Sequence, residues 1–218
     1  YDMGHYNIAF QGEGGLTKYF LANGIKITDD LSIGITASYI SGTLFDNTSI
    51  YYPDSTFFIN GKRSINMNIG DFKFDYGVLY KLPIDKYNIT VVLTYSQGSK
   101  IASRRDLFIR NTFKGFGNQN ESPIDTLVYT EDERVNIKIP GGFGIGVRIN
   151  DGSGWDVGAD FNWARWNGFE MNGVNDSLQN SWNIAVGGSY KPEATSISKY
   201  YKRITYRGGF HFDQTYYN

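Results

Sequence analysis

No cysteine occurs among the 218 residues, which excludes disulfide frameworks and thiolate metal sites. Neither charge sign is in excess, because 21 Lys and Arg stand against 22 Asp and Glu. A nucleic-acid partner is not predicted, since binding phosphates calls for surplus Lys and Arg. No run approaches the roughly 18 consecutive apolar residues of a membrane helix, and there are only five prolines. These absences leave folds built from strands open.

Aromatic residues and glycine are plentiful instead. Phe, Trp and Tyr make up 17% of the chain, and there are 26 glycines, a mixture that favours strands and tight turns. Apolar and polar residues alternate with period two through most of the sequence, whereas helical periodicity is hard to find. We predict about nine strands, several longer than the usual five or six residues, at about 4–10, 17–28, 31–45, 66–82, 87–101, 134–150, 155–166, 181–191 and 200–212.

The predicted connections are of two kinds. Compact ones rich in turn residues lie at 28–30, 83–86, 151–154 and 192–199, and long polar ones lie at 46–65, 102–133 and 167–180. Successive turns of an antiparallel meander lie at opposite ends of the sheet. Gathering short turns at one end and long loops at the other is typical of outer-membrane barrels. We therefore predict an all-β fold, an antiparallel transmembrane β-barrel of the outer-membrane type.

Aromatic residues recur eight positions apart on the apolar side of four strands. Eight strand residues rise about 26 Å, or about 20 Å along the membrane normal for a tilted strand, close to the height of the apolar band between aromatic girdles. A soluble sandwich whose apolar faces pack together is the alternative. The spacing favours the barrel and predicts these membrane-interface residues: Phe72, Tyr80, Tyr87, Tyr95, Trp155, Trp163, Trp182 and Tyr190.

The opposite side of the strands carries charges of both signs, which suits a hydrated or ion-paired interior. The predicted lumen-lining residues are Asp71, Lys73, Asp75, Arg148, Asp156, Asp160, Arg203 and Arg207.

No motif predicts catalysis. The glycines of Gly142-Phe143-Gly144-Ile145-Gly146 alternate along a strand with no helix after them, so they do not form a dinucleotide fingerprint. His5 and His211 lack carboxylate or cysteine neighbours at ligand spacing. We predict no enzyme, no catalytic residue, no cofactor and no metal site.

Six segments carry a family resemblance through their order and spacing. They are LANGIKITDDLSIGITASY (21–39), FDYGVLYKL (74–82), IKIPGGFGIGV (137–147), WDVGADFNWARW (155–166), WNIAVGGSY (182–190) and YRGGFHFDQT (206–215). Together they resemble the long-chain fatty-acid transporter (FadL-type) family of outer-membrane barrels, especially its Bacteroidota-like relatives. The resemblance implies fourteen strands, an N-terminal hatch and location in the outer membrane of a Gram-negative bacterium. With about nine strands, residues 1–218 are then expected to be one internal barrel portion that lacks the hatch and the closing strands.

The resemblance implies uptake of hydrophobic or amphipathic small molecules such as long-chain fatty acids, with the lipid bilayer and an apolar ligand as partners. The alternative is a structural or accessory barrel subunit of a larger outer-membrane assembly, such as a protein-secretion complex. Its protein partners would bind the long extracellular loops, notably 102–133 with Phe108, Phe113 and Phe116. A third hypothesis is a soluble sandwich that binds glycans through exposed Tyr and Trp.

Overall fold

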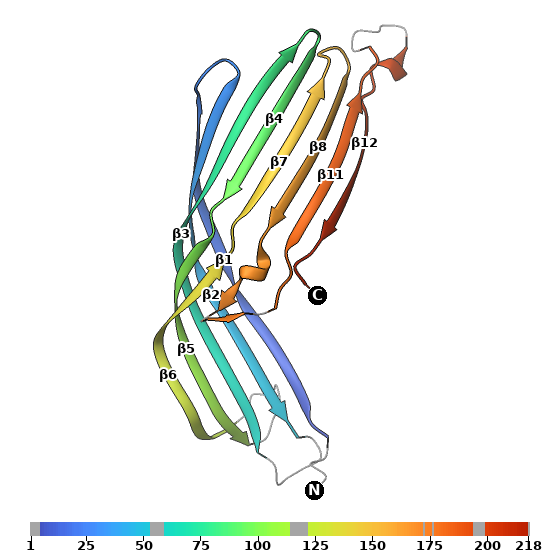
Figure 1. Cartoon of the computed structure of the whole chain (residues 1–218). Helices are drawn as coiled ribbons and strands as arrows, with labels where there is room; N and C mark the ends of the chain where they lie inside the picture. The colour runs from blue at the N-terminus through green and yellow to red at the C-terminus, as the bar shows by residue number, and fades with distance from the viewer. Residues whose placement is uncertain are drawn as a thin grey trace. The chain divides into compact units, whose positions relative to one another are not determined.

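The chain is almost entirely β-structure (Figure 1). The computed structural model describes residues 5–52, 59–113, 122–171, 173–175, 177–193 and 199–217. Its elements are β1 (Asn7–Lys26), β2 (Leu31–Tyr51), β3 (Asn60–Ile84), β4 (Tyr87–Ser96), β5 (Ser99–Phe113), β6 (Ser122–Ile139), β7 (Gly142–Asn150), β8 (Trp155–Ala164), the 3-10 turn η1 (Trp166–Gly168), β9 (Glu170–Met171), β10 (Val174–Asn175), β11 (Ser181–Tyr190), the 3-10 turn η2 (Tyr200–Lys202) and β12 (Tyr206–Gln214). In the part of the chain that the structure describes, no helix is both long and apolar enough to cross a membrane.

The described strands form one 12-stranded sheet in the order β10-β9-β6-β5-β3-β4-β7-β8-β11-β12, and β2 joins β1 to β3. All pairs with a defined register are antiparallel, which confirms the predicted fold class at that level. The sheet is not closed within the described residues, because β1 pairs only with β2 and β12 only with β11.

Long strands run through two compact units. Unit 1 comprises Tyr1–Tyr19, Tyr39–Phe72 and Ile101–Ile137, and unit 2 comprises Phe20–Ser38, Lys73–Lys100 and Lys138–Asn218. Within unit 1, β3 pairs with β5, whereas within unit 2 it pairs with β4. The buried hydrophobic residues are concentrated in unit 1, at Ile65, Met67, Ile69, Ile101, Val135 and Ile137.

Two predicted strands are each divided in the structure. The predicted strand 87–101 is β4 followed by β5, with a break at Gln97–Gly98, and 134–150 is the end of β6 followed by β7, with a break at Pro140–Gly141. The two breaks lie side by side, since a Cβ on Gly98 would stand only 2.9 Å from the backbone nitrogen of Gly141. Proline cannot donate to the ladder, and the close approach admits only glycine, so both strands are interrupted at the same place.

Other predicted boundaries were wrong. The described residues of the segments 4–10 and 17–28 lie mostly in the single strand β1, and residue 4 is outside the described range. The loop predicted at 102–133 is mostly β5 and β6, with residues 114–121 outside the described range. In the loop predicted at 46–65, the described residues mostly continue β2 and β3, with 53–58 outside the described range. The segment 167–180 holds β9 and β10, with residues 172 and 176 outside that range. Charged and polar residues made these stretches read as loops, because period two detects only strands with one apolar face.

The short connections follow from local hydrogen bonds. Thr28 Oγ1 accepts the backbone N–H groups of Asp30 and Leu31 between β1 and β2. Asp85, with φ of 53°, forms the reversal between β3 and β4. Asp151 closes the β7–β8 turn, where Gly152 has φ of 69°. These left-handed positions suit Asp and Gly, which keeps the connections tight.

Candidate functional surfaces

Two aromatic rows cross the exposed apolar face of unit 2. The cross-strand registers align one residue of each strand in the Trp163 row, which consists of Tyr76, Tyr95, Phe143, Trp163 and Trp182. The second row, the Trp155 row, lies eight residues along the strands from the Trp163 row. It consists of Tyr87, Trp155, Tyr190 and Tyr206. Two separate heights are therefore marked by rings.

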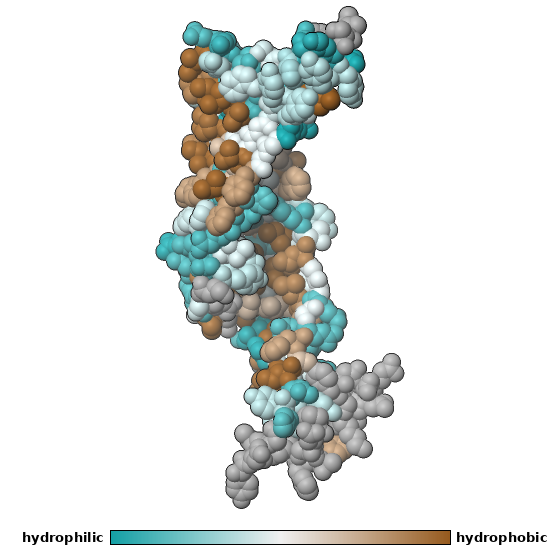
Figure 2. Space-filling view, turned by 90° about the vertical axis from the view of Figure 1, so that its right-hand side faces the viewer, coloured by the Kyte–Doolittle hydropathy of each residue, from teal (hydrophilic) through white to brown (hydrophobic). Residues whose placement is uncertain are grey.

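Three rows between them are almost wholly apolar and form the apolar band. Its members from β3 to β12 are Val78, Leu93, Ile145, Phe161, Ile184 and Phe212; Tyr80, Val91, Val147, Ala159, Val186 and Phe210; and Leu82, Ile89, Ile149, Val157, Gly188 and Gly208. Many are exposed, including Phe210 at 71% and Leu93 at 49%. In the upper part of Figure 2, hydrophobic residues gather along one side beneath a hydrophilic end. An exposed apolar surface of this kind marks a site of contact with a membrane or with another protein.

Neighbouring rings within each row are in contact. The Phe143 and Trp163 centroids lie 5.4 Å apart, and those of Tyr87 and Trp155 lie 5.8 Å apart. Trp182 Nε1 donates to Gln214 Oε1 at 2.5 Å. An indole that has a polar partner on one side and apolar neighbours on the other is suited to a boundary between water and hydrocarbon.

Six of the eight aromatic residues singled out by sequence lie in these two rows, and Phe72 and Tyr80 do not. Tyr80 is opposite Val91 within the apolar band. Phe72 belongs to unit 1, where its ring lies 4.9 Å from that of Tyr39. On β3 the row positions are instead held by Tyr76 and Ile84. Spacing within one strand does not reveal its register against neighbours, and the assignment to a membrane interface stays a prediction.

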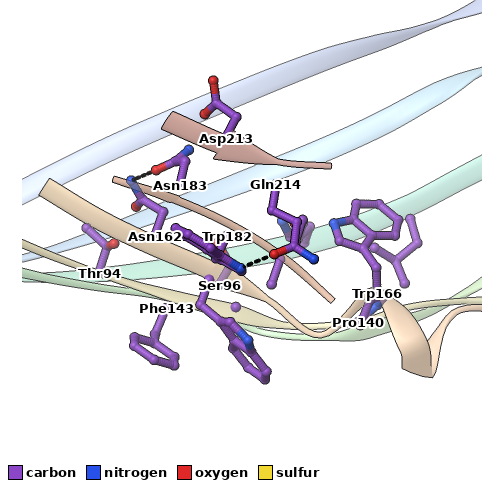
Figure 3. Close-up of a pocket in the computed structure, with 16 residues that line it drawn as sticks. Thr94, Ser96, Pro140, Phe143, Asn162, Trp166, Trp182, Asn183, Asp213 and Gln214 are labelled. Carbon is purple, nitrogen blue, oxygen red and sulfur yellow. Dashed lines mark hydrogen bonds between the residues drawn. The ribbon is translucent and has the colours of Figure 1, made fainter. Parts of the chain in front are cut away.

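The other face of unit 2 carries a polar row that sequence reasoning missed. Thr94, Asn162, Asn183 and Asp213 are aligned across four strands, with Gly144 between the first two. Asn162 Nδ2 donates to Asn183 Oδ1 at 3.0 Å, and the row borders a hollow of about 460 Å³ (Figure 3). Alternation places these residues on the polar side of their strands, but only the strand registers align them in one row.

Four of the predicted lumen-lining residues come together. Arg148 forms an ion pair with Asp156, and both border a second hollow, of about 550 Å³, together with Asp160 and Arg207. Glycines also line the hollow, and a Cβ on Gly146 would clash with the carboxylate of Asp160. Glycine therefore lets a neighbouring carboxylate lie over the backbone.

The remaining four are dispersed. Lys73 Nζ lies 3.4 Å from Asp75 Oδ1, whereas Asp71 lies in unit 1 and accepts the backbone N–H of Phe72. Arg203 is not in a strand as predicted, because β12 begins only at Tyr206; it follows η2 and lies over the Tyr200 ring at 5.5 Å. The lumen-lining role of all eight stays a prediction.

The polarity of the two faces of β3 changes between the units, although the same face stays the less exposed one. Within unit 1 the buried positions are Ile65, Met67 and Ile69, whereas Lys73 and Asp75, on the same face by period two, are polar in unit 2. The opposite face carries Asn66 and Asn68 in unit 1, then Phe74, Tyr76 and Val78 in unit 2. One strand thus fits an aqueous surround in unit 1 and an apolar surround in unit 2.

Ion pairs join β5 and β6 within unit 1. Arg104 Nη1 donates to both carboxylate oxygens of Asp132 at 2.9 Å, and Arg105 Nη2 to Glu133 Oε2 at 2.6 Å. The sequence signal that could have predicted this pairing is a pair of adjacent arginines followed, 28 residues later, by a pair of adjacent acidic residues. All four residues fall within the loop predicted at 102–133.

The β7–β8 turn holds an unusually acidic carboxyl. A hydrogen bond from the Ser153 hydroxyl, followed by bonds from the backbone N–H groups of Ser153, Gly154 and Trp155, keeps the pKa of Asp151 well below its usual value. No group of three or more His, Asp or Glu side chains within the described residues could hold a metal ion.

Comparison with known proteins corrects the family assignment. The model of the BamG family matches residues 2–218, which is nearly the whole chain. No curated protein matches the sequence. The resemblance to FadL-type transporters was therefore wrong, and so was the uptake of long-chain fatty acids inferred from it. The alternative of an accessory subunit agrees better with the match.

Two other expectations are confirmed by the family match, namely that the protein is not an enzyme and that it is located in the Gram-negative outer membrane. Association with protein partners is confirmed in general form, as membership of the β-barrel assembly machinery (BAM) complex. The chain belongs to the BamG family, which consists of non-catalytic accessory components of this machinery in the outer membrane.

Proposed function

We propose that the chain is a membrane-embedded accessory subunit of the BAM complex, anchored by unit 2. Unit 2 is a portion of a transmembrane β-barrel, with the apolar band against lipid. The arrangement that carries this proposal is the Trp163 row on β3, β4, β7, β8 and β11 and the Trp155 row on β4, β8, β11 and β12, with three apolar rows between them. Its height matches the apolar band of membrane barrels, about 25 Å.

The polar face of unit 2 then lines the barrel interior. A charge facing hydrocarbon costs about 2–4 kcal/mol at the midplane, so the ion pair of Arg148 and Asp156 is placed on the side away from lipid. The Asn162–Asn183 hydrogen bond satisfies two further polar groups there. These contacts hold the wall in shape, and we assign them a structural role.

Unit 1 stands in water in this proposal. Its apolar residues are buried, with Val135 only 1% exposed, and the other face of β3 bears Asn66 and Asn68. Asn66 Nδ2 donates to Asp106, and Thr43 Oγ1 donates to Asn68.

The free edges of β1 and β12 have a consequence in a bilayer. Unpaired backbone N–H and C=O groups each cost several kcal/mol in hydrocarbon. Both strands are exposed along nearly their whole length and pair on one edge only among the described residues. Further antiparallel strands therefore complete the barrel between them.

A neighbouring pair of substitutions tests the anchoring role. Val91→Arg places a charge in the middle row of the apolar band, whereas Thr90→Arg places it on the polar face one residue away. We expect the Val91→Arg protein to be lost from outer-membrane fractions and from purified BAM complex, because a lipid-facing charge there costs about 2–4 kcal/mol. We expect recovery of the Thr90→Arg protein to be close to that of the wild type. Equal recovery of the two variants would contradict the proposal.

A further inference from the structure

The two halves of β6 differ in their surroundings. Near its C-terminal end, Val135 and Ile137 are buried at 1% and 6%. By contrast, every residue from Pro123 to Tyr129 is exposed. We call residues 123–131 the β6 arm.

The arm is held as a strand at its base. Asp132 has φ of 55°, donates its backbone N–H to Asp106 Oδ1 at 2.9 Å and is held by Arg104. Along the arm itself the Phe108 and Tyr129 rings lie 4.5 Å apart, which connects it to β5. The arm is thus a preformed strand, and a partner would not have to order it on binding.

One edge of the arm is open. β5 occupies one edge of β6, and the only strand described on the other is β9, which has two residues. The Glu170 side chain of β9 meets Lys138 at 3.0 Å, within unit 2 and beyond the arm. The backbone groups along the outer edge of the arm therefore face no strand within the described residues, and such an edge is a template for strand addition.

The side chains of the arm are better suited to contact with another protein than to contact with water or lipid. Ile124 and Val128 on one face are 51% and 38% exposed, and Leu127 and Tyr129 on the other are 57% and 54% exposed. Apolar exposure on both faces of one strand marks an interaction site. The carboxylates of Asp125 and Glu131, on the same strand, would be costly in hydrocarbon.

The same two carboxylates indicate the charge of the partner. Neither forms an ion pair with a Lys or Arg among the residues that the structure describes. The Glu131 carboxylate accepts a hydrogen bond from the Tyr129 hydroxyl at 2.6 Å, which holds the carboxylate on the arm. This hydrogen bond raises the pKa of the Tyr129 hydroxyl. A strand with Lys or Arg opposite these positions would satisfy both.

We propose that the β6 arm binds an extended strand of another BAM-complex protein, one with alternating apolar residues and with Lys or Arg facing Asp125 and Glu131. The added strand extends the sheet beyond β6. This inference rests on the proposed function only in taking the chain to act within the assembled complex, and does not depend on how unit 2 meets lipid.

Hydrogen exchange tests strand addition directly. BAM complex purified from outer membranes is compared with the chain alone in the same detergent. Amides of the arm are expected to exchange about tenfold or more slowly in the complex, while amides of β7, already paired on both edges, stay unchanged. Equal exchange in both samples overturns the proposal. If the arm is as well protected in a monomeric sample of the chain alone as in the complex, the proposal is also overturned, because the chain's own residues then cover the edge. If the arm is protected only because the chain alone forms a dimer, the edge binds a second copy, and the proposal is overturned as well.

Charge reversal gives an independent measurement. Asp125→Lys with Glu131→Lys is expected to lower the yield of the co-purified partner and to abolish the slow exchange, without changing recovery from the membrane. The matched control is Asp213→Lys, a reversal on the polar face of unit 2. Arm variants that keep full exchange protection overturn the proposal. Failure of the proposed membrane anchoring would instead appear as equal membrane recovery of Val91→Arg and Thr90→Arg, whatever the arm variants show.

Discussion

Tyr87 and Trp155 are in ring contact, 5.8 Å apart, although β7 lies between their strands in the sheet. The contact is available because β7 ends at Asn150, which is paired with Asn88 on one side and Asp156 on the other. Each ring thus stands one residue beyond the end of the β7 ladder. The Trp155 row therefore crosses the position of β7 through this ring contact, where no β7 residue is paired with either Tyr87 or Trp155.

The contact predicts an energetic coupling. In a double-mutant cycle, Tyr87→Ala and Trp155→Ala should show a coupling free energy of about 0.5–1.5 kcal/mol, as measured for other aromatic pairs. Reversible urea unfolding from lipid bilayers supplies the free energies. The cycle of Tyr87→Ala with Trp182→Ala is the control, since Trp182 lies in the other row, and it should give no coupling. Coupling of the same size in both cycles would show that the contact is not its source.

Backbone proximity makes a second prediction at Gly142. A Cβ there would lie 2.5 Å from the backbone oxygen of Trp163, which cannot move aside as a side chain would, so Gly142→Ala should lower the free energy of unfolding by about 1–3 kcal/mol. Gly208→Ala is the matched control, because a Cβ at Gly208 meets nothing within 4 Å. The measurement is again urea unfolding, and an unchanged midpoint for Gly142→Ala would argue against this backbone approach.

The two ion pairs of unit 1 should differ in strength. The side chains of Arg104 and Asp132 are 61% and 60% exposed, so Arg104→Ala should cost about 0–1 kcal/mol. Those of Arg105 and Glu133 are 20% and 35% exposed, and Arg105→Ala leaves a part-buried carboxylate without its donor, at about 1–3 kcal/mol. Thermal unfolding at low and at 1 M salt separates them, because only the Arg104 contribution should vanish with salt. Equal losses would contradict this difference in burial.

The Asp151 turn predicts a dependence on pH. Its folded-state pKa is depressed, chiefly by the Ser153 hydroxyl, so its contribution to stability is present above the unfolded-state pKa of about 3.9 and is lost as the pH falls towards the folded-state value. The wild-type unfolding temperature should therefore decline below about pH 4. Asp151→Asn should flatten that decline, and Ser153→Ala should reduce it. A decline identical in all three proteins would place its origin elsewhere.

Alternation along single strands was enough to predict an antiparallel all-β chain with one apolar and one polar face in unit 2. The prediction succeeded for the Trp155–Trp163 strand because one face of this strand is apolar along its whole length and the other is polar. It failed for β5 and β6, whose charged doublets are satisfied only by each other, at Arg104–Asp132 and Arg105–Glu133. Pairing between residues 28 apart is not visible in a local pattern.

Register explains the other misses. Phe72 and Tyr80 have the same spacing as Tyr87 and Tyr95, yet only the latter two fall in the aromatic rows, because β3 is offset against β4 by its two-residue turn. The polar row through Asn162 and Asn183 likewise arises from pairing of separate strands. The family could not be inferred from strand patterns either, since barrels of different function share them.

The central claim, that the apolar band faces lipid, is tested most directly with two single cysteines in this cysteine-free chain. Ala159→Cys lies in the middle of the band and Asp160→Cys on the polar face beside it. In intact outer membranes, a membrane-soluble maleimide should modify both. A water-soluble maleimide should modify Asp160→Cys about tenfold or more faster than Ala159→Cys, because thiols react as thiolates and those form in water. Equal rates with the water-soluble reagent would contradict the account.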